Sequence, residues 1–547
     1  MSPLVTRPPS LGGELLEERL RPPAEPKDAR AIVGLREPFS IFALAFAFYA
    51  AVGLYSTLGL DIVLGDAQSR LAHAYFVLWN DPGKLTAIGF YWPPLQTLVL
   101  LPLAAVKPLA TSLAALPLTS AVFAAGTLVV LDRALALAEI DRALRWALLA
   151  AFGLNPMIVY FAGNGMAESL YLFFLTTAFY LYVRWTVKPR WYDLPLAGLA
   201  FSFGVLSRYE VAFWLPLVAV GVVAVQMRRR EDVAKIEAAL LSVVIPVIYG
   251  LMLWTYVTWS ITGDPTAYLA VASRPDLPPA GTATELTLQA LVIHLTLFPA
   301  APLLAGILLA LAVARRSVVA LVLSGALLLN ALSTIVFLVR TLEDVPLLLR
   351  YNMRAMPLSI VALSWLLVQL APRRRRLGAL TAIAVLLLAI PATAATMATA
   401  RYQLGEAAFL EAIRTGASQN GQPGPRGPGI DVKAQKEMAE WIRAHVPGRD
   451  TILADDSQSF GVMLQDGNPE RYLDRVDISD ERWAFVRDHP VGRVRYLLVQ
   501  RGATRGRDPV FYDRILDAYP TLGTGEPPPS LRLVHENGKY LLYAVSR

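Results

Sequence analysis

The chain has 547 residues, of which 55% are hydrophobic and only 17% are charged. This composition is typical of an integral membrane protein that carries some soluble mass. The net charge of +7 does not indicate a nucleic-acid partner, because many of the basic residues lie in short segments between apolar stretches. The lack of cysteine excludes disulfide bonds and thiolate metal sites.

The N-terminal segment 1–38 is expected to be a disordered cytoplasmic tail. Its first 36 residues are rich in Pro, Arg and Glu and contain no apolar core. A cleavable signal peptide requires such a core, so none is predicted here.

The region 39–399 is predicted to be an all-α transmembrane domain of about eleven helices. A stretch of about 18 to 23 apolar residues is long enough to cross the hydrocarbon layer of a bilayer. The candidate spans are 39–60, 113–132, 146–163, 168–185, 194–207, 211–227, 237–259, 289–313, 318–339, 353–371 and 377–398, of which 194–207 is short and is expected to extend. The apolar segment 94–108 is also short and is bounded by prolines, so it is predicted to be a re-entrant or interfacial helix.

Clusters of basic residues assign the sides of the membrane. They occur in alternate connections, and the positive-inside rule places those connections and the N-terminal tail in the cytoplasm. The clusters are Arg133 with Arg142 and Arg145, Arg184 with Lys188 and Arg190, Arg228 to Arg230, Arg315 with Arg316, and Arg373 to Arg376. We therefore predict a multi-pass protein of the cell membrane with a cytoplasmic N-terminus and an extracytoplasmic C-terminus.

The last part of the chain differs in composition from the spans. Segment 400–430 is expected to be a linker, because it contains a run rich in Gly, Pro and Gln at 416–429. Segment 431–547 then alternates helix-like and strand-like stretches and ends in a probable hairpin around Asn537-Gly538. This pattern predicts a small extracytoplasmic α/β domain. It contains no phosphate-binding glycine motif, so a nucleotide site is not expected there.

With this topology, polar residues from several connections share the outer face. Charged groups near a bilayer are costly and usually mark a substrate path or pair with each other. Simpler explanations exist: Asp66 as an ordinary loop residue, Arg208 and Glu210 as an ion pair, and Glu168 as a carboxylate favoured by a helix N-terminus. Tyr91 and Trp92 are at least equally well explained as an interfacial aromatic belt. The candidate catalytic residues are Asp66 and Glu168, and the candidate substrate-binding residues are Arg70, His73, Tyr91, Trp92, Asn164, Arg208, Glu210, Arg350 and Arg354.

The motifs that contain these residues resemble the GT-C superfamily of polytopic membrane glycosyltransferases. Within it, the likeness is to bacterial proteins grouped with the protein O-mannosyltransferase and aminoarabinose transferase families, and it covers about 39–370. Those enzymes place an essential acidic residue in the first outer loop and another at the second outer turn, which correspond here to Asp66 and Glu168. Many relatives have an Asp-Glu pair in the first loop, whereas this chain has Asp66-Ala67. The difference leaves open the acceptor class and whether a divalent metal ion takes part.

The resemblance implies an inverting glycosyltransferase that moves a sugar from a polyprenyl-phosphate donor to an acceptor hydroxyl at the outer face of the membrane. Asp66 would act as the base and one or more of the outer arginines would hold the departing phosphate. The other outer residues would bind substrate, and the acceptor would be an envelope protein, lipid or glycan. A transporter or flippase of lipid-linked sugars is the alternative, although the sequence has no convincing internal repeat. A non-catalytic scaffold whose tail binds envelope partners is a third hypothesis.

Overall fold

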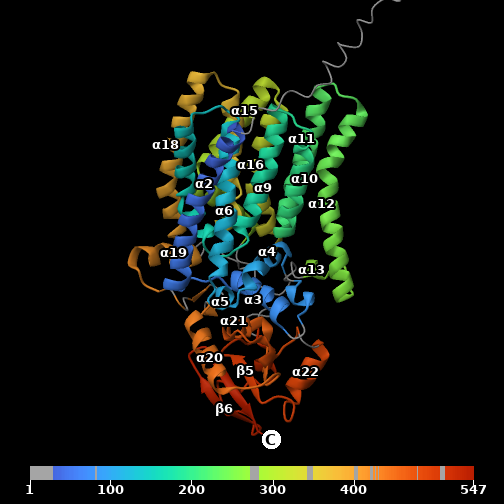
Figure 1. Ribbon diagram of the computed structural model, residues 1–547, viewed down its shortest axis with the longest axis vertical. Coiled ribbons are helices and arrows are strands. Elements are labelled where there is room, and N and C mark those ends of the chain that lie inside the picture. The colour runs from blue at the N-terminus through green and yellow to red at the C-terminus, as the bar shows by residue number, and fades with distance from the viewer. Residues whose placement is uncertain are drawn as a thin grey trace, which may run out of the picture.

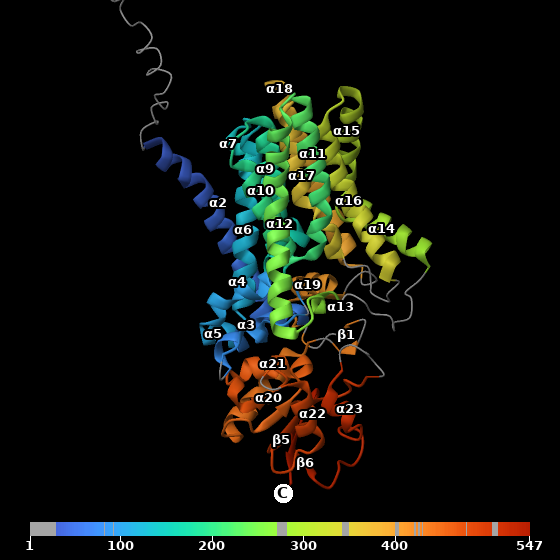
Figure 2. The ribbon, with the colours of Figure 1, turned by 90° about the vertical axis from the view of Figure 1, so that its right-hand side faces the viewer.

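The computed structural model describes residues 29–80, 83–90, 92–270, 282–341, 349–399, 404–418, 420, 423–424, 427–428, 430–476, 479–505 and 512–546. Long helices run side by side and form a bundle, and a small α/β domain lies at one end of it (Figure 1). Short helices lie between the bundle and this domain (Figure 2). The arrangement is that of a multi-pass membrane protein with an attached soluble domain.

Among the described residues, eight helical segments are long and apolar enough to cross a membrane. Two bent pairs raise the count to ten if each pair is one span: α7 (Arg142–Gly153) with α8 (Pro156–Ala162), and α14 (Ala283–Leu297) with α15 (Ala300–Arg315). The eight are α2 (Ala29–Leu54) with the π-helical turn η1 (Tyr55–Gly59), α6 (Ala115–Ala136), α9 (Glu168–Val187), η3 (Tyr209–Phe213) with α11 (Trp214–Arg228), α12 (Val233–Thr262), α16 (Val318–Thr341), η4 (Leu349–Asn352) with α17 (Ala355–Val368), and α18 (Pro372–Met397).

The predicted count of eleven spans is therefore not confirmed. The predicted span that is absent from the count of ten is 194–207. It forms α10 (Asp193–Ser207), a helix of only 15 residues. At 1.5 Å per residue it covers roughly 22 Å, less than the hydrocarbon thickness of about 30 Å. The tail prediction also needs correction at its end, because α2 begins at Ala29 and not after residue 38.

The first outer loop forms a layer of short helices. They are α3 (Gly65–Trp79), η2 (Leu85–Ile88), α4 (Leu95–Ala104) and α5 (Lys107–Thr111), and they lie where the bundle meets the α/β domain (Figure 1). The apolar segment 94–108 thus forms two short helices, and α4 with 10 residues is too short to cross a bilayer. The Trp79 indole donates to the Ala104 carbonyl oxygen at 3.0 Å and holds α3 against α4.

The basic connections meet at the opposite end of the bundle. Arg375 and Lys188 both approach Glu139, with N–O distances of 3.2 and 3.9 Å. Arg229 donates to the carbonyl oxygen of Thr186 at 3.2 Å. Clusters that are distant in sequence therefore share one end, as their alternation along the chain predicts.

The α/β domain contains a five-stranded sheet in the order β4-β3-β5-β7-β6. Strands β4, β3 and β5 are parallel, whereas β7 is antiparallel to both β5 and β6. The predicted alternation of helices and strands and the final hairpin are present. The elements are α20 (Val432–His445), β3 (Ile452–Ala454), α21 (Asp456–Asp466), η5 (Pro469–Arg471), β4 (Tyr472–Leu473), α22 (Asp480–Asp488), β5 (Tyr496–Gln500), α23 (Arg514–Ala518), β6 (Leu531–Glu536) and β7 (Tyr540–Val545).

The segment expected to be a linker contains regular structure. Helix α19 (Leu404–Thr415) follows α18, and the short strands β1 (Pro423–Gly424) and β2 (Gly427–Pro428) pair as a small hairpin. The remaining element, α13 (Ala267–Ala270), follows α12 and lies at the end of the bundle that faces the α/β domain (Figure 1).

The α/β domain is bonded directly to α3. The amides of Gln68 and Gln435 exchange two hydrogen bonds, at 2.6 and 3.3 Å. The Tyr75 hydroxyl donates to the Gly467 carbonyl oxygen at 2.8 Å. Because Gln68 and Gln435 are both buried, these polar contacts fix the position of α3 and of the side chains on it.

Candidate active site

Four connections that are far apart in sequence bring charged side chains together at the end of the bundle that faces the α/β domain. Asp66 lies in the first turn of α3 and Glu168 is the first residue of α9. Arg208 lies between α10 and η3, and Arg350 lies in η4. Carboxylates in first turns are favoured by the partial positive charge of helix N-termini, which supports both acidic positions.

These side chains form a continuous ion network around Glu168. Arg208 Nη1 lies 2.7 Å from Glu168 Oε1, and Arg350 Nε lies 3.7 Å from the same oxygen. Arg208 Nη2 also reaches Glu210 Oε1 at 2.8 Å, and Arg350 Nη1 reaches Asp66 Oδ2 at 3.5 Å. The Arg208–Glu210 ion pair considered from the sequence is therefore present, but as one part of a larger network.

The two acidic residues differ in accessibility. The side chain of Asp66 is 33% exposed, whereas that of Glu168 is 0% exposed. A ligand can therefore approach Asp66 directly, while Glu168 is enclosed by the arginines that it binds. One oxygen of Glu168, Oε2, has no hydrogen-bond partner among the described residues.

Arg70 adds unused hydrogen-bond donors to the site. It lies one turn after Asp66 on α3, is buried, and stacks over the Trp92 ring at 4.6 Å. Its Nε and Nη1 have no hydrogen-bond partner in the described part of the chain. Burial lowers the pKa of Arg70 to about 10, while nearby Asp66 opposes that shift, so the group stays charged at neutral pH.

Arg354 lies at the edge of the network and is held by backbone contacts. Its Nε and Nη2 donate to the Tyr351 carbonyl oxygen at 3.0 and 2.8 Å. Its guanidinium also lies over the Trp214 ring, 5.2 Å from the centroid. These contacts leave Arg354 better suited to shape the site than to bind a ligand with its whole fork.

Two aromatic residues of the site were not predicted. The guanidinium of Arg208 lies 5.4 Å from the Tyr171 ring centroid and 5.2 Å from that of Tyr351. Arg350 also lies over the Tyr351 ring, at 5.8 Å. Such cation–π contacts orient guanidinium groups without using their N–H donors. The sequence signal was the position of Tyr351 directly after Arg350.

Asn164 shapes the turn that precedes Glu168. Its Oδ1 accepts a hydrogen bond from the Met166 backbone at 3.1 Å, whereas its Nδ2 has no partner among the described residues. The next residue, Gly165, has φ of 76°, a conformation that favours glycine. Gln96 of α4 donates to the Gly165 carbonyl oxygen at 3.1 Å and joins this turn to the first outer loop.

Two predicted residues are not part of the described network. His73 Nδ1 lies 2.8 Å from the Ala87 carbonyl oxygen, and the ring is near Asp456 and Arg475 of the α/β domain. His73 therefore lies two turns along α3, where that helix meets the α/β domain, and not among the charged residues of the ion network. Tyr91 lies outside the described residues.

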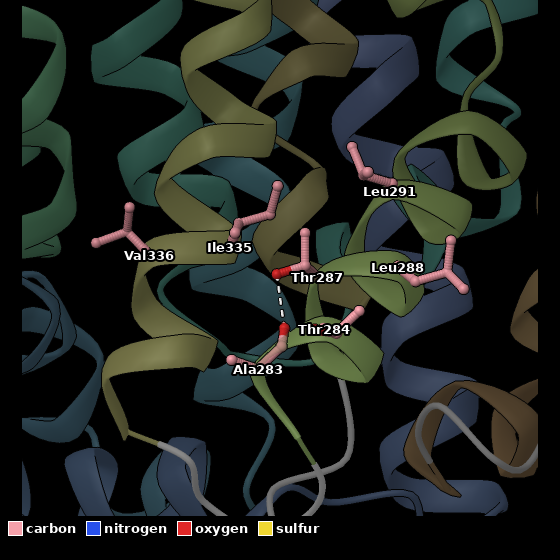
Figure 3. Close-up of a pocket in the computed structure, with 7 residues that line it drawn as sticks. All are labelled: Ala283, Thr284, Thr287, Leu288, Leu291, Ile335 and Val336. Carbon is pink, nitrogen blue, oxygen red and sulfur yellow. Dashed lines mark hydrogen bonds between the residues drawn. The ribbon is translucent and has the colours of Figure 1, made fainter.

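An apolar cavity opens beside the turn that carries Arg350. It has a volume of about 740 Å³ and lies between α14 and α16 (Figure 3). The turn η4, which carries Arg350, contacts both α14 and α16, and Asn330 of α16 donates to the Asn352 carbonyl oxygen of η4 at 3.4 Å. The lining residues are Ala283, Thr284, Thr287, Leu288, Leu291, Ile335 and Val336.

No group of three or more His, Asp or Glu residues within the described ranges is arranged to hold a metal ion. The ion network instead pairs each carboxylate with a guanidinium.

Comparison with solved structures identifies the fold. The chain matches ArnT from Cupriavidus metallidurans bound to undecaprenyl phosphate with a TM-score of 0.54 and 14% identity, over 92% of this chain and 97% of ArnT. The apo state of ArnT matches with a TM-score of 0.50 and 15% identity over the same shares. No protein-family model and no curated protein matches the sequence. The predicted likeness is therefore confirmed at the level of the fold, which this chain shares with ArnT over most of both chains.

Proposed function

We propose that this protein is an inverting glycosyltransferase that moves a sugar from a polyprenyl-phosphate donor to an acceptor hydroxyl at the outer face of the cell membrane. The observation that carries the proposal is the ion network of Asp66, Arg350, Glu168, Arg208 and Glu210. It combines one accessible carboxylate with guanidinium groups that can bind a phosphate. The shared fold with ArnT, which was solved with undecaprenyl phosphate, supports the same donor class.

Asp66 is the proposed base. An acceptor hydroxyl has a pKa far above 7 and needs a positioned group to remove its proton during attack. Of Asp66 and Glu168, Asp66 is the one that a ligand can reach. Arg350, at 3.5 Å, keeps the Asp66 carboxylate oriented. Glu168 is enclosed, and its proposed part is to position Arg208 and Arg350.

The phosphate is proposed to bind Arg70 and Arg350. Two donors of Arg70 are free of hydrogen bonds among the described residues, and so is Nε of Arg350. Guanidinium groups bind phosphate oxygens in pairs of hydrogen bonds, which makes them suitable for this task. Four guanidinium groups, those of Arg70, Arg208, Arg350 and Arg354, stand near three carboxylates, those of Asp66, Glu168 and Glu210, and the nearby Glu406 is only partly charged because burial raises its pKa to about 7. The excess positive charge favours an anionic ligand.

The apolar cavity between α14 and α16 is the proposed seat of the first isoprene units. Its walls are apolar apart from two threonines, and the Thr287 hydroxyl is already bonded to the Ala283 carbonyl oxygen (Figure 3). An isoprenoid chain has no hydrogen-bonding groups, so it matches such walls. Both helices that line the cavity also contact η4, which carries Arg350, and this supports a lipid chain that runs from the cavity to the proposed phosphate site.

The reaction is a single displacement. The acceptor oxygen forms a bond with the anomeric carbon while the bond from that carbon to the phosphate oxygen breaks. Asp66 takes the proton of the acceptor hydroxyl, and the polyprenyl phosphate leaves with the electron pair, stabilised by the arginines. One displacement inverts the configuration at the anomeric carbon. A transporter would instead need charged groups along a path through the bundle, whereas these gather at one end.

The proposal predicts that Asp66→Asn abolishes sugar transfer and leaves the thermal stability of the purified protein nearly unchanged. An amide cannot take up the proton, and the half-exposed position of Asp66 keeps the folding cost small. The measurement is release of polyprenyl phosphate and formation of glycosylated acceptor, followed by mass spectrometry in lipid nanodiscs.

The matched control is Asp264→Asn, which changes an exposed carboxylate whose hydrogen bonds to described residues are to Thr266 in its own turn. It lies after α12 at the same end of the bundle (Figure 1). Activity of this control should equal that of the unmodified protein. Retention of more than a few per cent of transfer by Asp66→Asn would remove Asp66 from the role of base.

A further inference from the structure

Helix α19 packs against the bundle next to the ion network. It contacts α8, η1 and α18. The ring of Phe409 lies 4.9 Å from that of Tyr160 on α8. A Cβ atom at Gly405 would lie only 2.9 Å from the Tyr160 hydroxyl, so the close approach of α19 requires glycine at this position. Gly405 and Phe409 thus pack α19 against Tyr160, and Glu406 lies between them in the sequence.

Glu406 itself is an unexplained buried carboxyl group. Its side chain is 0% exposed, and neither carboxyl oxygen has a hydrogen-bond partner among the described residues. Burial of a polar group without a hydrogen bond is costly, and buried polar groups in folded proteins nearly always have partners. A group that lacks them in this structure is therefore a candidate for contact with a ligand.

Other partly satisfied polar atoms surround the same place. The Tyr160 side chain is near Glu406, Asn164, Arg350 and Glu168. Neither the Tyr160 hydroxyl nor the Asn164 amide nitrogen makes a well-formed hydrogen bond within the described ranges. Glu406 is also within electrostatic range of Arg350 and Glu168. The carboxyl, hydroxyl and amide groups therefore border the ion network directly.

We propose that Glu406, Tyr160 and Asn164 form the subsite that binds the hydroxyl groups of the transferred sugar, with Glu406 as a specificity-determining residue. The inference rests on the proposed function. A phosphate at neutral pH offers mainly acceptors and is matched by the arginines. A sugar offers both donors and acceptors, and it is matched by a carboxyl that accepts, an amide that donates and a phenol that does both.

The ionisation of Glu406 suits this task. Burial raises its pKa to about 7, and Arg350 and Glu168 act on it in opposite directions. Near neutral pH the group is present in both forms, so it can accept a hydrogen bond from one sugar hydroxyl or donate one to another. Helix α19 covers Glu406 in this structure. A sugar can therefore reach Glu406 only when α19 separates from α8 by the thickness of the sugar ring.

The test compares bare undecaprenyl phosphate with undecaprenyl phosphate that carries a hexose, a pentose or an aminopentose. Affinities are measured for the full-length protein in nanodiscs with Glu406→Gln, Glu406→Ala and the control Glu411→Gln. Glu411 lies on the same helix but is exposed and pairs with Arg414. We expect both Glu406 variants to weaken binding of at least one glycosylated lipid tenfold or more. Binding of bare undecaprenyl phosphate should change less than twofold, and Glu411→Gln should change neither.

Each outcome has a distinct meaning. If the unmodified protein binds neither kind of lipid, the proposed function fails. If it binds bare and glycosylated lipids equally, or if the Glu406 variants lose both to the same extent, the sugar subsite is wrong while the proposed function stands. Thermal unfolding of every variant identifies a loss of fold, and the near-isosteric Glu406→Gln keeps the test valid if Glu406→Ala does not fold.

Discussion

Glu168 is central to the site because two guanidinium groups reach the same carboxylate oxygen. Arg208 is its closer partner and also binds Glu210, so one side chain joins an enclosed carboxylate to a more exposed one. Removing one partner of a buried ion pair usually costs more than the pair contributes, because an unpaired charge remains. Glu168 therefore makes Arg208 important for stability as well as for any ligand.

We predict that Arg208→Ala lowers both transfer and thermal stability. The loss in transfer should be on the order of 2–4 kcal/mol, the range for removal of a group that stabilises developing charge. Arg208→Lys should rescue only partly, because a single ammonium cannot span Glu168 and Glu210 as the guanidinium does. The measurements are kcat/KM and unfolding temperature for each variant.

The double variant Arg208→Ala with Glu210→Ala separates two explanations. If Arg208 served only to pair with Glu210, the double variant would recover part of the stability lost in the single one. We expect little recovery, because Glu168 still loses its partner at 2.7 Å. Full recovery together with unchanged affinity for polyprenyl phosphate would show that Arg208 is only a structural partner of Glu210.

Glu406 predicts a pH dependence of stability. Its pKa is about 7 in the folded protein, above the ordinary value of 4.5, and the charged groups that face it are Arg350 and Glu168, with Tyr160 beside them. The folded state therefore keeps a proton that the unfolded state releases between these values. Stability from this group is complete below pH 4.5 and is lost as the pH rises through 7, by up to about 3 kcal/mol.

A glutamine cannot ionise, so Glu406→Gln should escape this loss. We expect its unfolding temperature relative to the unmodified protein to rise from pH 5 to pH 8, with most of the change between pH 5 and 7.5. The comparison cancels other groups that titrate in this range, such as Asp466 with a pKa raised by burial to about 6. Parallel pH curves for both proteins would contradict the prediction, and Glu411→Gln should follow the unmodified protein.

At the scale of residues, the sequence predicted those members of the site that stand next to span ends. The charged residues at the edges of apolar stretches are Asp66, Glu168, Arg208 and Arg350. Placing a charged side chain near a bilayer is costly, so its presence there indicates a functional site. Tyr160 and Glu406 carry no such mark. Tyr160 lies inside an apolar run, and Glu406 lies in a segment with the composition of a linker, so only the fold brings them beside Arg350.

At the scale of elements, length and hydropathy predicted most of the bundle but not its interruptions. The bends of 76° between α7 and α8 and of 94° between α14 and α15 occur at breaks that contain or precede proline, within stretches that look continuous in hydropathy. Helix α10 is shorter than a span, and it packs between α9 and α12. Neighbouring helices therefore cover α10, whereas an isolated helix would need more residues to span the hydrocarbon layer.

Helix α19 shows why short helices escape prediction. Twelve residues with glycine near each end have little helical stability of their own, so packing must supply it. Phe409 and Ala412 are buried and provide that packing against the bundle. The hairpin around Asn537-Gly538 was predictable for the opposite reason, because its turn chemistry is local.

At the scale of the whole molecule, the α/β domain has a place in the site through α3. Gln435 bonds to Gln68, which lies between Asp66 and Arg70 on that helix. The domain therefore holds from one side the helix that carries the proposed base and the proposed phosphate ligand. This pairing could not be predicted from the sequence, because the two glutamines are 367 residues apart.

The separation of charges along the bundle predicts how the molecule is oriented in the cell membrane. The basic connections meet at one end, and the first-loop helices and the α/β domain lie at the other (Figure 2). From the positive-inside rule we expect the basic end to be cytoplasmic, and the ion network and the C-terminus to be extracytoplasmic. This assignment rests on which elements share an end of the bundle.

A reporter that is active only in the cytoplasm tests the orientation. Fused after Arg547 it should be silent, and inserted after Arg230, in the basic connection between α11 and α12, it should be active. The second fusion is the control for expression and membrane insertion, because both carry the same reporter on the same bundle. Strong activity after Arg547 with silence after Arg230 would reverse the orientation and place the site in the cytoplasm. A polyprenyl-phosphate sugar displayed at the outer face could then not be its donor.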